Sequence, residues 1–422
     1  MTESSQFAQL GTLLLEAGFS VTDTRDALDE VRRRVAPDVE LSFAVLPEAV
    51  FVSPADGSQA PILRVAFASS LSTRQSAMVS RLMHRLRDGL ITLDTALGPE
   101  QERIRAAAMR RPVMRWVVGN ALLAGGLALL FRCPWWAVLV ATAVGTVIGG
   151  MAVLLRRIRP AAAIAPFLIA LVSTVLVSEA ASLLGYSSVP LFAVCAPVAI
   201  LVPGALITNA LLELTAADVV TGASRLVYGI VLLGFMVAGI AAGSALIGLE
   251  VDEGSAVLLA DVSGVISAGP AWASLPSAAF SWIGVVGVAV GISLVFGAGY
   301  RLTAVSIAAM GVAYALLFTA APHWGSTIAT GVAAAVLFVL ARLAERSTLA
   351  IPAAITFQPA FLLLVPGTVG LVALASFDID TVAAAPAVFF SLCIGIKIGS
   401  IVVDTHWWRL FGPRSRGAGV DG

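Results

Sequence analysis

The chain has 422 residues, of which 59% are hydrophobic and 12% are charged, and its mean hydropathy is +0.94. An ordinary soluble core cannot bury so much apolar surface, so the composition excludes a soluble globular protein and indicates a polytopic membrane protein. The formal net charge is zero and says little about partners, and no nucleic-acid partner is expected.

The N-terminal part, residues 1–112, is less apolar than the remainder and is predicted to form a small cytoplasmic α/β domain. Residues 6–17 and 22–35 have the apolar spacing of two helices. Thr22 or Asp23 is placed to cap the second helix.

Two strands and a further helix are predicted next in this domain. Residues 41–53 and 61–68 are expected to be strands around the turn "PADGSQ". The stretch "STRQSAMVSRLMHRLRDGL" at 72–90 is predicted as an amphipathic helix with exposed arginines. This basic face either rests on anionic lipid or is simply solvated. The role of the domain is left open between regulation, gating and dimer contact, so a homo-oligomer stays open as well.

From about Arg115 onward, apolar runs of roughly 18 to 25 residues alternate with short polar breaks, and runs of this length span the hydrocarbon core of a bilayer. Ten transmembrane helices are therefore predicted. Their approximate ranges are 114–131, 134–155, 161–183, 189–212, 226–249, 277–297, 302–320, 324–343, 351–375 and 381–405.

The arginines predict the orientation, because short cytoplasmic loops carry an excess of Lys and Arg. With the N-terminal domain in the cytoplasm, fifteen arginines fall on the cytoplasmic side and only Arg132 on the other. The long loop 250–276 contains four acids and neither Lys nor Arg, as expected outside the cell. Both termini of this multi-pass protein are therefore predicted to be cytoplasmic, and its location is the cytoplasmic (inner) cell membrane. The fifteen are Arg103, Arg105, Arg110, Arg111, Arg115, Arg156, Arg157, Arg159, Arg225, Arg301, Arg342, Arg346, Arg409, Arg414 and Arg416.

The motif "LVPG" occurs twice, in "AILVPGALITNA" and in "LLLVPGTVGLVA". Pro203 and Pro366 are 163 residues apart, and the same offset carries the starts of the first five spans onto or near those of the last five. Each half has an odd number of spans, so the second half enters from the opposite face and the repeat is inverted, as is common in transporters. The predicted order is a cytoplasmic domain at 1–112, a first five-helix repeat at 113–250, an extracytoplasmic loop at 251–276, a second five-helix repeat at 277–406 and a cytoplasmic tail at 407–422.

Three stretches resemble those of the threonine/serine exporter family: "LLLEAGFSVTDTRDALDEV", "LVPGALITNALLELTAADVVTGASRLVYGIVL" and "FQPAFLLLVPGTVGL". The middle stretch is the most specific, because it keeps a Pro-Gly pair, a Thr-Asn pair, an acid, a glycine and an arginine in the family's order. The acid is Glu213 and the arginine is Arg225. The loop "TAADVVTG" departs from the family's pattern, in which more glycine is expected.

The resemblance implies ten transmembrane helices in two five-helix halves after a cytoplasmic domain. It also implies export of threonine and serine, driven by an ion gradient and therefore antiport, with protons as the expected coupling ion. Two-chain relatives are associated with dicarboxylate efflux, so an exporter of small dicarboxylates such as succinate is the alternative.

The paired Pro-Gly motifs are the predicted substrate site. A zwitterionic amino acid needs positive potential for its carboxylate and acceptors for its ammonium group, and the free ends of two broken helices supply both. The alternative is that Pro-Gly only kinks a packed helix and that the nearby polar side chains bond neighbouring helices. The predicted substrate-binding residues are Pro203, Gly204, Thr208, Asn209, Thr356, Gln358, Pro366 and Gly367.

Charged residues inside the spans are candidates for coupling or charge relay. Lys397, the chain's only lysine, lies within the last span and could attract a carboxylate, exchange a proton, reach the interface or pair with Asp404. Glu179, toward the outer end of the third span, could couple protons or contact outer-leaflet water. Asp404, near the inner end of the last span, is a further candidate, with a position at the membrane interface as its alternative. Glu213 and Arg225 join this group through the family stretch.

Other classes of function lack their motifs. The three His are far apart, no HExxH or GxSxG motif occurs in the spans and the three Cys stand alone, so neither an enzyme, a metal site nor a cofactor is predicted. No GxxxxGK[ST] loop indicates ATP drive. A passive channel would need a continuous polar path, whereas the polar residues gather at two helix breaks. Alternating access is therefore favoured.

Overall fold

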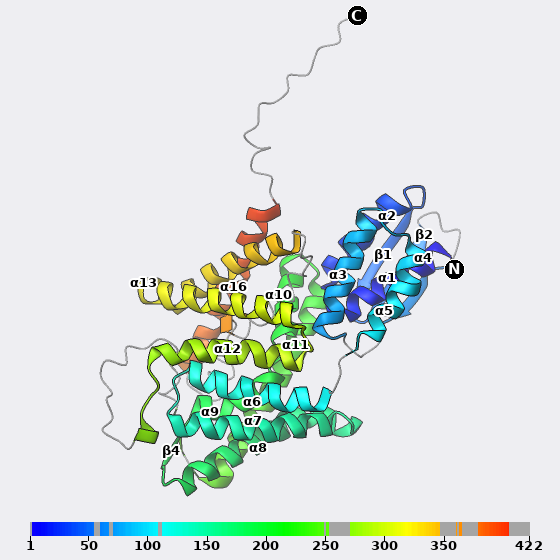
Figure 1. The fold of residues 1–422 in the computed structure, drawn as a ribbon. Coiled ribbons are helices and arrows are strands. Elements are labelled where there is room, and N and C mark those ends of the chain that lie inside the picture. Colours follow the sequence, from blue (N-terminus) through cyan, green and yellow to red (C-terminus); the bar gives the residue numbers. More distant parts are fainter. Residues whose placement is uncertain are drawn as a thin grey trace, which may run out of the picture.

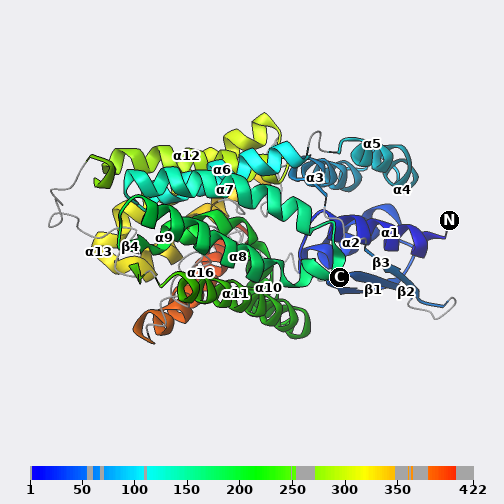
Figure 2. The same cartoon turned by 90° about the horizontal axis from the view of Figure 1, so that it is seen from below.

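The structure is a computed structural model that describes residues 2–54, 60–66, 71–108, 112–248, 250–252, 271–346, 360, 363–364 and 379–404. An α/β segment, residues 3–106, lies at one end of a body of long apolar helices (Figures 1 and 2). We refer to residues 3–106 as the N-terminal segment.

The N-terminal segment has its own hydrophobic core. Side chains of its helices and sheet meet there, and Phe7, Leu10, Leu28, Val50 and Leu86 are fully buried. The sheet is antiparallel in the order β1-β2-β3. Its elements are α1 Glu3–Glu16, α2 Val21–Val35, β1 Leu41–Leu46, β2 Ala49–Pro54, β3 Ile62–Val65, α3 Thr73–Arg87, α4 Leu93–Thr95, η1 Ala96–Glu100 and α5 Gln101–Ala106.

Two details of this segment differ from the sequence prediction. Residues 41–53 are not one strand but a hairpin, because the chain turns at Pro47 and Glu48 and β2 pairs back onto β1. Pro47 cannot donate to a strand ladder, which makes it a suitable turn residue. The cap of α2 is Ser20 and not Thr22 or Asp23, since Ser20 keeps an extended backbone and its side chain accepts the N–H of Asp23.

The remaining described elements are almost all helical. Within the part of the chain that the structure describes, six helices are long and apolar enough to cross a membrane, so the chain is a polytopic membrane protein. Their candidate spans are Pro112–Leu130, Trp135–Leu155, Ile164–Leu183, Val219–Ile247, Ala278–Val295 and Tyr300–Ala344. The elements are α6 Pro112–Leu130, α7 Trp135–Leu155, α8 Arg159–Leu183, β4 Ser188–Pro190, α9 Leu191–Cys195, η2 Ala196–Leu201, α10 Gly204–Thr215, α11 Val219–Ile247, β5 Glu250–Asp252, η4 Ala271–Ala273, α12 Ala278–Val295, α13 Tyr300–Arg346 and α16 Ile379–Asp404.

The range of α13 contains two helices. Gly325 has a non-helical backbone (φ 79°, ψ 159°), and the chain reverses there, as Figure 1 shows. This conformation favours glycine because a Cβ would clash in it. The two helices correspond to the predicted spans 302–320 and 324–343. The predicted span 351–375 lies outside the described residues, apart from 360 and 363–364.

The fifth predicted span begins earlier than expected. Helix α11 starts at Val219 rather than at 226, so Arg225 lies in the second turn of a helix and not in a loop. Gly222 lets this early part of α11 lie against α10, since a Cβ there would come within 2.8 Å of the Ala210 carbonyl oxygen and the Leu214 nitrogen. This close approach lets the polar start of α11 pack along α10 as a tight helical hairpin.

Glycines allow the long helices to approach one another closely. A Cβ on Gly119 would lie 2.8 Å from the Gly291 oxygen, and one on Gly291 would lie 2.6 Å from the Gly119 oxygen. Gly126 and Gly284 form a second pair of the same kind. These two pairs join α6 to α12 in antiparallel orientation, as small residues do at membrane helix interfaces.

The two ends of the helical body make different contacts. At one end, residues 21–25 and 73–77 of the N-terminal segment contact Glu213, Asp218, Phe296, Leu302 and Arg342. At the other end, β4 pairs in parallel with β5, and the Arg132 side chain donates to the Pro276 carbonyl at 3.1 Å. Successive helix ends therefore alternate between the two ends of the body.

Candidate functional site

The first Pro-Gly motif breaks a helix inside the protein. Helix α9 tightens into the 3₁₀ turn η2, Val202 leaves the helix with φ −58° and ψ 124°, and α10 begins at Gly204. The Gly204 N–H donates to the Val202 carbonyl at 2.7 Å, and the Ile207 N–H donates to the Pro203 carbonyl. Residues 196–200 are buried. This is the condition under which irregular backbone is tolerated at membrane depth.

Two polar side chains from other helices hold the carbonyl groups of this broken segment. The Asn120 amide of α6 donates to the Pro197 carbonyl at 3.1 Å and to the Gly145 carbonyl of α7 at 2.8 Å. Ser173 of α8 donates to the Val194 carbonyl at 3.0 Å. Asn120 is fully buried, and its Oδ1 has no hydrogen-bond partner among the described residues. The sequence prediction missed Asn120, although an uncharged amide within the apolar run 114–131 was a signal for it.

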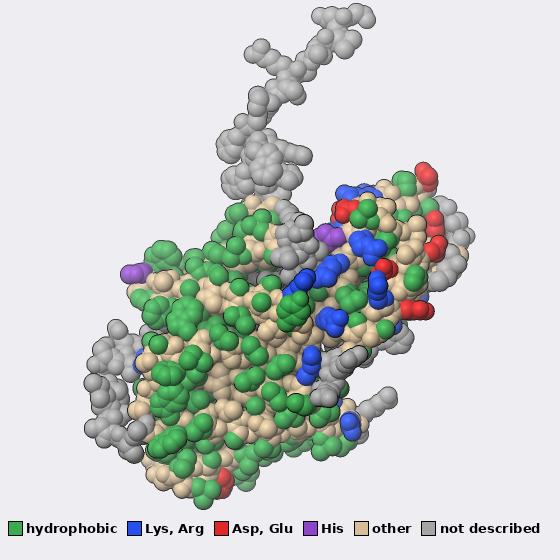
Figure 3. Space-filling model, in the orientation of Figure 1, with side chains coloured by type: hydrophobic (Ala, Val, Ile, Leu, Met, Phe, Trp, Pro, Cys, Tyr) green, Lys and Arg blue, Asp and Glu red, His purple; other side chains and the backbone are tan. Residues whose placement is uncertain are grey.

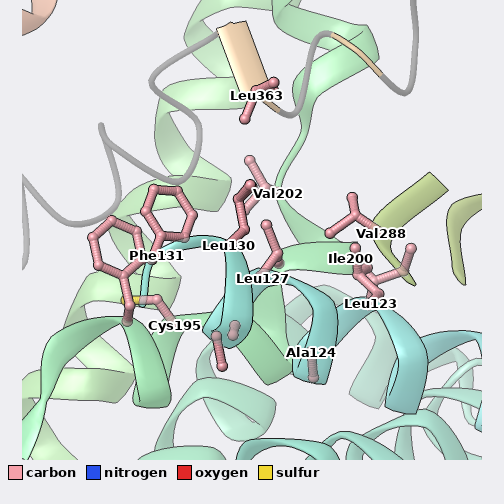
Figure 4. Packing of buried hydrophobic residues seen from close by; sticks show 14 of the residues in the cluster. Leu123, Ala124, Leu127, Leu130, Phe131, Cys195, Ile200, Val202, Val288 and Leu363 are labelled. Carbon is pink, nitrogen blue, oxygen red and sulfur yellow. The ribbon is translucent and has the colours of Figure 1, made fainter. Parts of the chain in front are cut away.

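The second Pro-Gly motif lies outside the described residues, as do Thr356 and Gln358. Leu363 and Leu364, which precede Pro366, are buried in the same hydrophobic cluster as Val202. Figure 4 shows Leu363 above Val202 and above Leu130 of α6. The residues that lead into the two Pro-Gly motifs therefore share one core.

The structure brings together two of the predicted coupling residues. Glu213, near the end of α10, is fully buried, and it forms an ion pair with Arg225 of α11, whose side chain is 13% exposed. The second carboxylate oxygen of Glu213, Oε2, is buried with no hydrogen-bond partner among the described residues. A buried acid with an open oxygen can take up a proton without first breaking a hydrogen bond to that oxygen.

The N-terminal segment completes this ionic site. The backbone N–H of Val21, the first residue of α2, donates to Glu213 Oε1 at 3.2 Å. Glu213 therefore lies at the N-terminus of α2, where the helix dipole favours a negative charge. The sequence did not predict this contact, because the two residues are 192 positions apart.

The same turn of α2 also binds the loop between α10 and α11. Asp218 pairs with Arg25 at 2.6 Å and accepts a hydrogen bond from Thr22 at 2.7 Å. Burial acts to raise the pKa of Asp218, but the hydrogen bonds from Arg25 and Thr22 and the charge of Arg25 outweigh it, so the pKa lies below its ordinary value of 3.8. The carboxylate is therefore charged when the segment is docked.

A model of the family described as "Putative threonine/serine exporter" matches residues 6–247, more than half of the chain. The chain belongs to this threonine/serine exporter family. The comparisons with curated proteins and with solved structures find no match. The family match includes the broken helix, the Glu213–Arg225 pair and the contacts of Val21, Thr22 and Arg25 with Glu213 and Asp218.

The other predicted site residues that the structure describes lie at several places in this exporter-family chain. Asn209 lies one turn before Glu213 on α10 and is half-buried. Lys397 is half-buried on α16, which contacts α10, and no described side chain forms an ion pair with it. Glu179 is exposed near the β4 end of α8. The side chains of Thr208 and Asp404 are outside the described part of the structure.

Proposed function

We propose that this chain is a secondary-active exporter of small amino acids, threonine or serine, that works by alternating access and is coupled to protons. The observation that carries the proposal is the buried helix break at Pro203 and Gly204, whose second half-helix, α10, leads to the buried acid Glu213. A broken helix in the protein interior is the element with which many transporters bind their substrates. The family membership supports the same function.

In this proposal the chain is built from two inverted five-helix repeats, residues 113–250 and 277–406. The glycine pairs of α6 and α12 support it, because Gly284 and Gly291 each lie 165 residues after their counterparts Gly119 and Gly126. A two-fold operation that exchanges the repeats turns the Gly119–Gly291 contact into the Gly284–Gly126 contact. This offset is close to the 163 residues between the two Pro-Gly motifs.

A second pair of helix contacts supports the repeat. In the first half, Gly239 and Gly243 of α11 pack against α8. In the second half, Gly395 and Gly399 of α16 pack against the second helix of α13. Both pairs have the small-xxx-small spacing of close membrane helix contacts. The third and fifth helices of one half thus contact each other as the third and fifth helices of the other half do.

We place the N-terminal segment in the cytoplasm, and with it both termini and the helix ends that it contacts. The alternation of contacts between the two ends of the body supports this topology through the described spans, and the arginine count decides the side. The helix ends at Glu213, Phe296 and Arg342 are all predicted to be cytoplasmic. Cysteines introduced into the loop 250–276 should react with a membrane-impermeant reagent on intact cells. Labelling only after permeabilisation would reverse the orientation.

The chemistry of the substrate fits two broken helices. The N–H groups at the start of α10 favour the carboxylate of an amino acid, while carbonyl groups at the end of the preceding half favour its ammonium group. Asn120 and Ser173 hold that preceding half in place through its carbonyls. We assign substrate binding to the two Pro-Gly motifs with Thr208, Asn209, Thr356 and Gln358 beside them. Glu213 with Arg225 is assigned to proton coupling, with Lys397 as a second charged group, while Glu179 and Asp404 lie at helix ends.

The N-terminal segment is proposed to restrain the cytoplasmic gate. Within one turn of α2, Val21 binds α10, Arg25 binds the loop that follows, and Asp23 pairs with Arg342 of α13 at 3.4 Å. This turn therefore links a helix of the first repeat to a helix of the second. If the repeats separate at this end during transport, at least one of these contacts must break.

Proteoliposomes test the proposed function. Counterflow of radiolabelled threonine, serine and succinate would be measured for the parent and for the variant in which Pro203 and Gly204 are both replaced by Ala. Threonine or serine counterflow that saturates in the parent and weakens in the variant is the expected result, since a continuous helix would remove the two helix ends that the break presents. Transport of succinate alone would give the function to the dicarboxylate alternative. A variant that transports like the parent would show that the break is only a kink.

A further inference from the structure

Helix α3 is attached to the end of the membrane helices. The Thr73 N–H donates to the Phe296 carbonyl, at the end of α12, with a distance of 2.8 Å. One turn later, Ala77 is buried against Leu302 at the start of α13, and Ala298 and Val305 pack beside them. The first two turns of α3 therefore lie at the level where the apolar helices begin.

Three exposed arginines surround this contact. Arg74 and Arg81 lie three residues before and four residues after Ala77, which places them on the same face of α3. Arg301 precedes Leu302 on α13 and is also exposed. We call Arg74, Arg81 and Arg301 the arginine rim. Figure 3 shows the basic side chains gathered between the N-terminal segment and the apolar body.

The arginine rim has no acidic partner among the described residues. Helix α3 contains no Asp or Glu, and Arg85, one turn after Arg81 on the same face, pairs instead with Glu100 of η1 at 2.9 Å. Arg301 bonds only to the neighbouring tyrosine among the described groups, with its Nε 3.0 Å from the Tyr300 hydroxyl. Tyr300 is 79% exposed beside apolar helices. An exposed tyrosine at such a position is typical of the membrane interface.

We propose that the arginine rim binds the phosphate groups of anionic phospholipids in the leaflet next to the N-terminal segment. The guanidinium groups match phosphate oxygens in geometry and charge, and they belong to two elements that meet at the membrane surface. The three side chains are exposed around a buried contact. Neighbouring lipid head groups in a leaflet can engage all of them together. Lipid binding would fasten α3, and with it the N-terminal segment, to the bilayer.

Lipid retention by the intact protein in detergent tests this inference. Phosphatidylglycerol and phosphatidylcholine would each be titrated, and bound lipid would be measured by native mass spectrometry. The test variant is Arg74→Gln/Arg81→Gln, and the control is Arg33→Gln/Arg103→Gln, which removes the same charge from exposed positions on α2 and α5. The test variant should bind phosphatidylglycerol roughly 30-fold more weakly, about fivefold for each arginine, while the control stays within about twofold of the parent.

Further measurements distinguish a lipid head group from a free phosphate ion. Phosphatidylcholine binding should be equal in all three proteins, and added salt should weaken only the binding of phosphatidylglycerol. Equal losses in the test and control variants would reduce the effect to net charge and overturn the proposal. Competition by millimolar inorganic phosphate would assign the arginines to a free anion, which would overturn it as well. Arg301→Gln should lower phosphatidylglycerol binding about fivefold, and an unchanged value would remove that residue from the rim.

Discussion

The backbone N–H of Val21 donates to Glu213 Oε1 at 3.2 Å, across 192 residues of sequence. The same oxygen is the one that pairs with Arg225. One buried carboxylate thus joins the start of α2 in the N-terminal segment to the half-helix α10 and to α11. A change in the charge of Glu213 would therefore alter both the ion pair at the proposed transport site and the hydrogen bond that docks the N-terminal segment.

Exchanging the charges of Arg25 and Asp218 should preserve docking. Each single change, Arg25→Asp or Asp218→Arg, places like charges opposite each other and should raise hydrogen exchange in α2. The double variant restores an ion pair and should return exchange close to that of the parent. Because 38% of the Arg25 side chain is exposed, we expect the pair to contribute about 1 kcal/mol or less. A double variant that exchanges as fast as either single one would contradict the pairing.

The same pair sets a dependence on pH. The pKa of Asp218 is below its ordinary value of 3.8 when the segment is docked, so the docked form binds fewer protons than the released form. Its contribution is therefore complete above that ordinary value and is lost as the pH falls through the lowered pKa. Hydrogen exchange in α2, corrected for the intrinsic rate, should rise at acidic pH in the parent. In Asp218→Asn this part of the rise should be missing.

Glu213→Gln should separate proton coupling from substrate exchange. The amide keeps the shape of the side chain but not its charge, so counterflow should continue while transport driven by a pH gradient should fall. Arg225 would lose its carboxylate partner, which is expected to destabilise the protein by up to about 3 kcal/mol. Glu213→Gln/Arg225→Gln removes both charges and should recover most of that stability without recovering coupling. Normal proton-driven transport by Glu213→Gln would take this residue out of the mechanism.

Gly284→Ala should weaken the contact between α6 and α12. Its Cβ would lie 2.7 Å from the Gly126 oxygen and from the Leu130 nitrogen, and these backbone atoms can yield only if the helices separate. We expect a loss of about 1–3 kcal/mol, the usual cost of overpacking. Gly234→Ala on α11 is the control, because no atom lies within 4 Å of its added Cβ. The temperature at which detergent-solubilised protein aggregates should fall for the first variant and hold for the second.

Ala217→Gly should stabilise the turn between α10 and α11. Ala217 has a φ of 66°, a left-handed conformation that costs a residue with a Cβ about 1 kcal/mol. Glycine adopts it freely, and the turn keeps its hydrogen bond from the Asp218 N–H to the Glu213 carbonyl. The aggregation temperature should rise, with transport unchanged. A lower temperature would mean that the entropy of the glycine outweighs the relief of strain.

Lys397→Ala should abolish export while the protein remains inserted and folded. Lys397 is half-buried on α16 and has no ion-pair partner among the described side chains, so a substrate or proton is the partner we expect it to meet. Lys397→Arg should not restore full export, because a guanidinium group is larger and does not release its proton. Export by the Ala variant at the parent's rate would show that the lysine only reaches the membrane interface.

Local chemistry explains what could be predicted from the sequence alone. The hydropathy and length of an apolar segment define a membrane span without reference to the helices that pack against it. The predicted ranges 134–155 and 277–297 therefore agree closely with α7 and α12. The break at Pro203 and Gly204 was predictable for the same reason, since a proline lacks the N–H that a helix needs. The hairpin turn at Pro47 was missed, although its signal was equally local.

Tertiary structure decided which distant residues meet. The acid Glu213 and the arginine Arg225 could be named from their motif, but their contact with Val21 depends on where the N-terminal segment docks. The roles of Asn120 and of the paired glycines likewise depend on which helix lies opposite, because a hydrogen bond or a missing Cβ acts only on the neighbour that packing provides. The amino-acid sequence by itself determined the membrane class, spans such as α7 and α12, and the helix break at Pro203 and Gly204, while packing between segments far apart in the chain decided the ionic site.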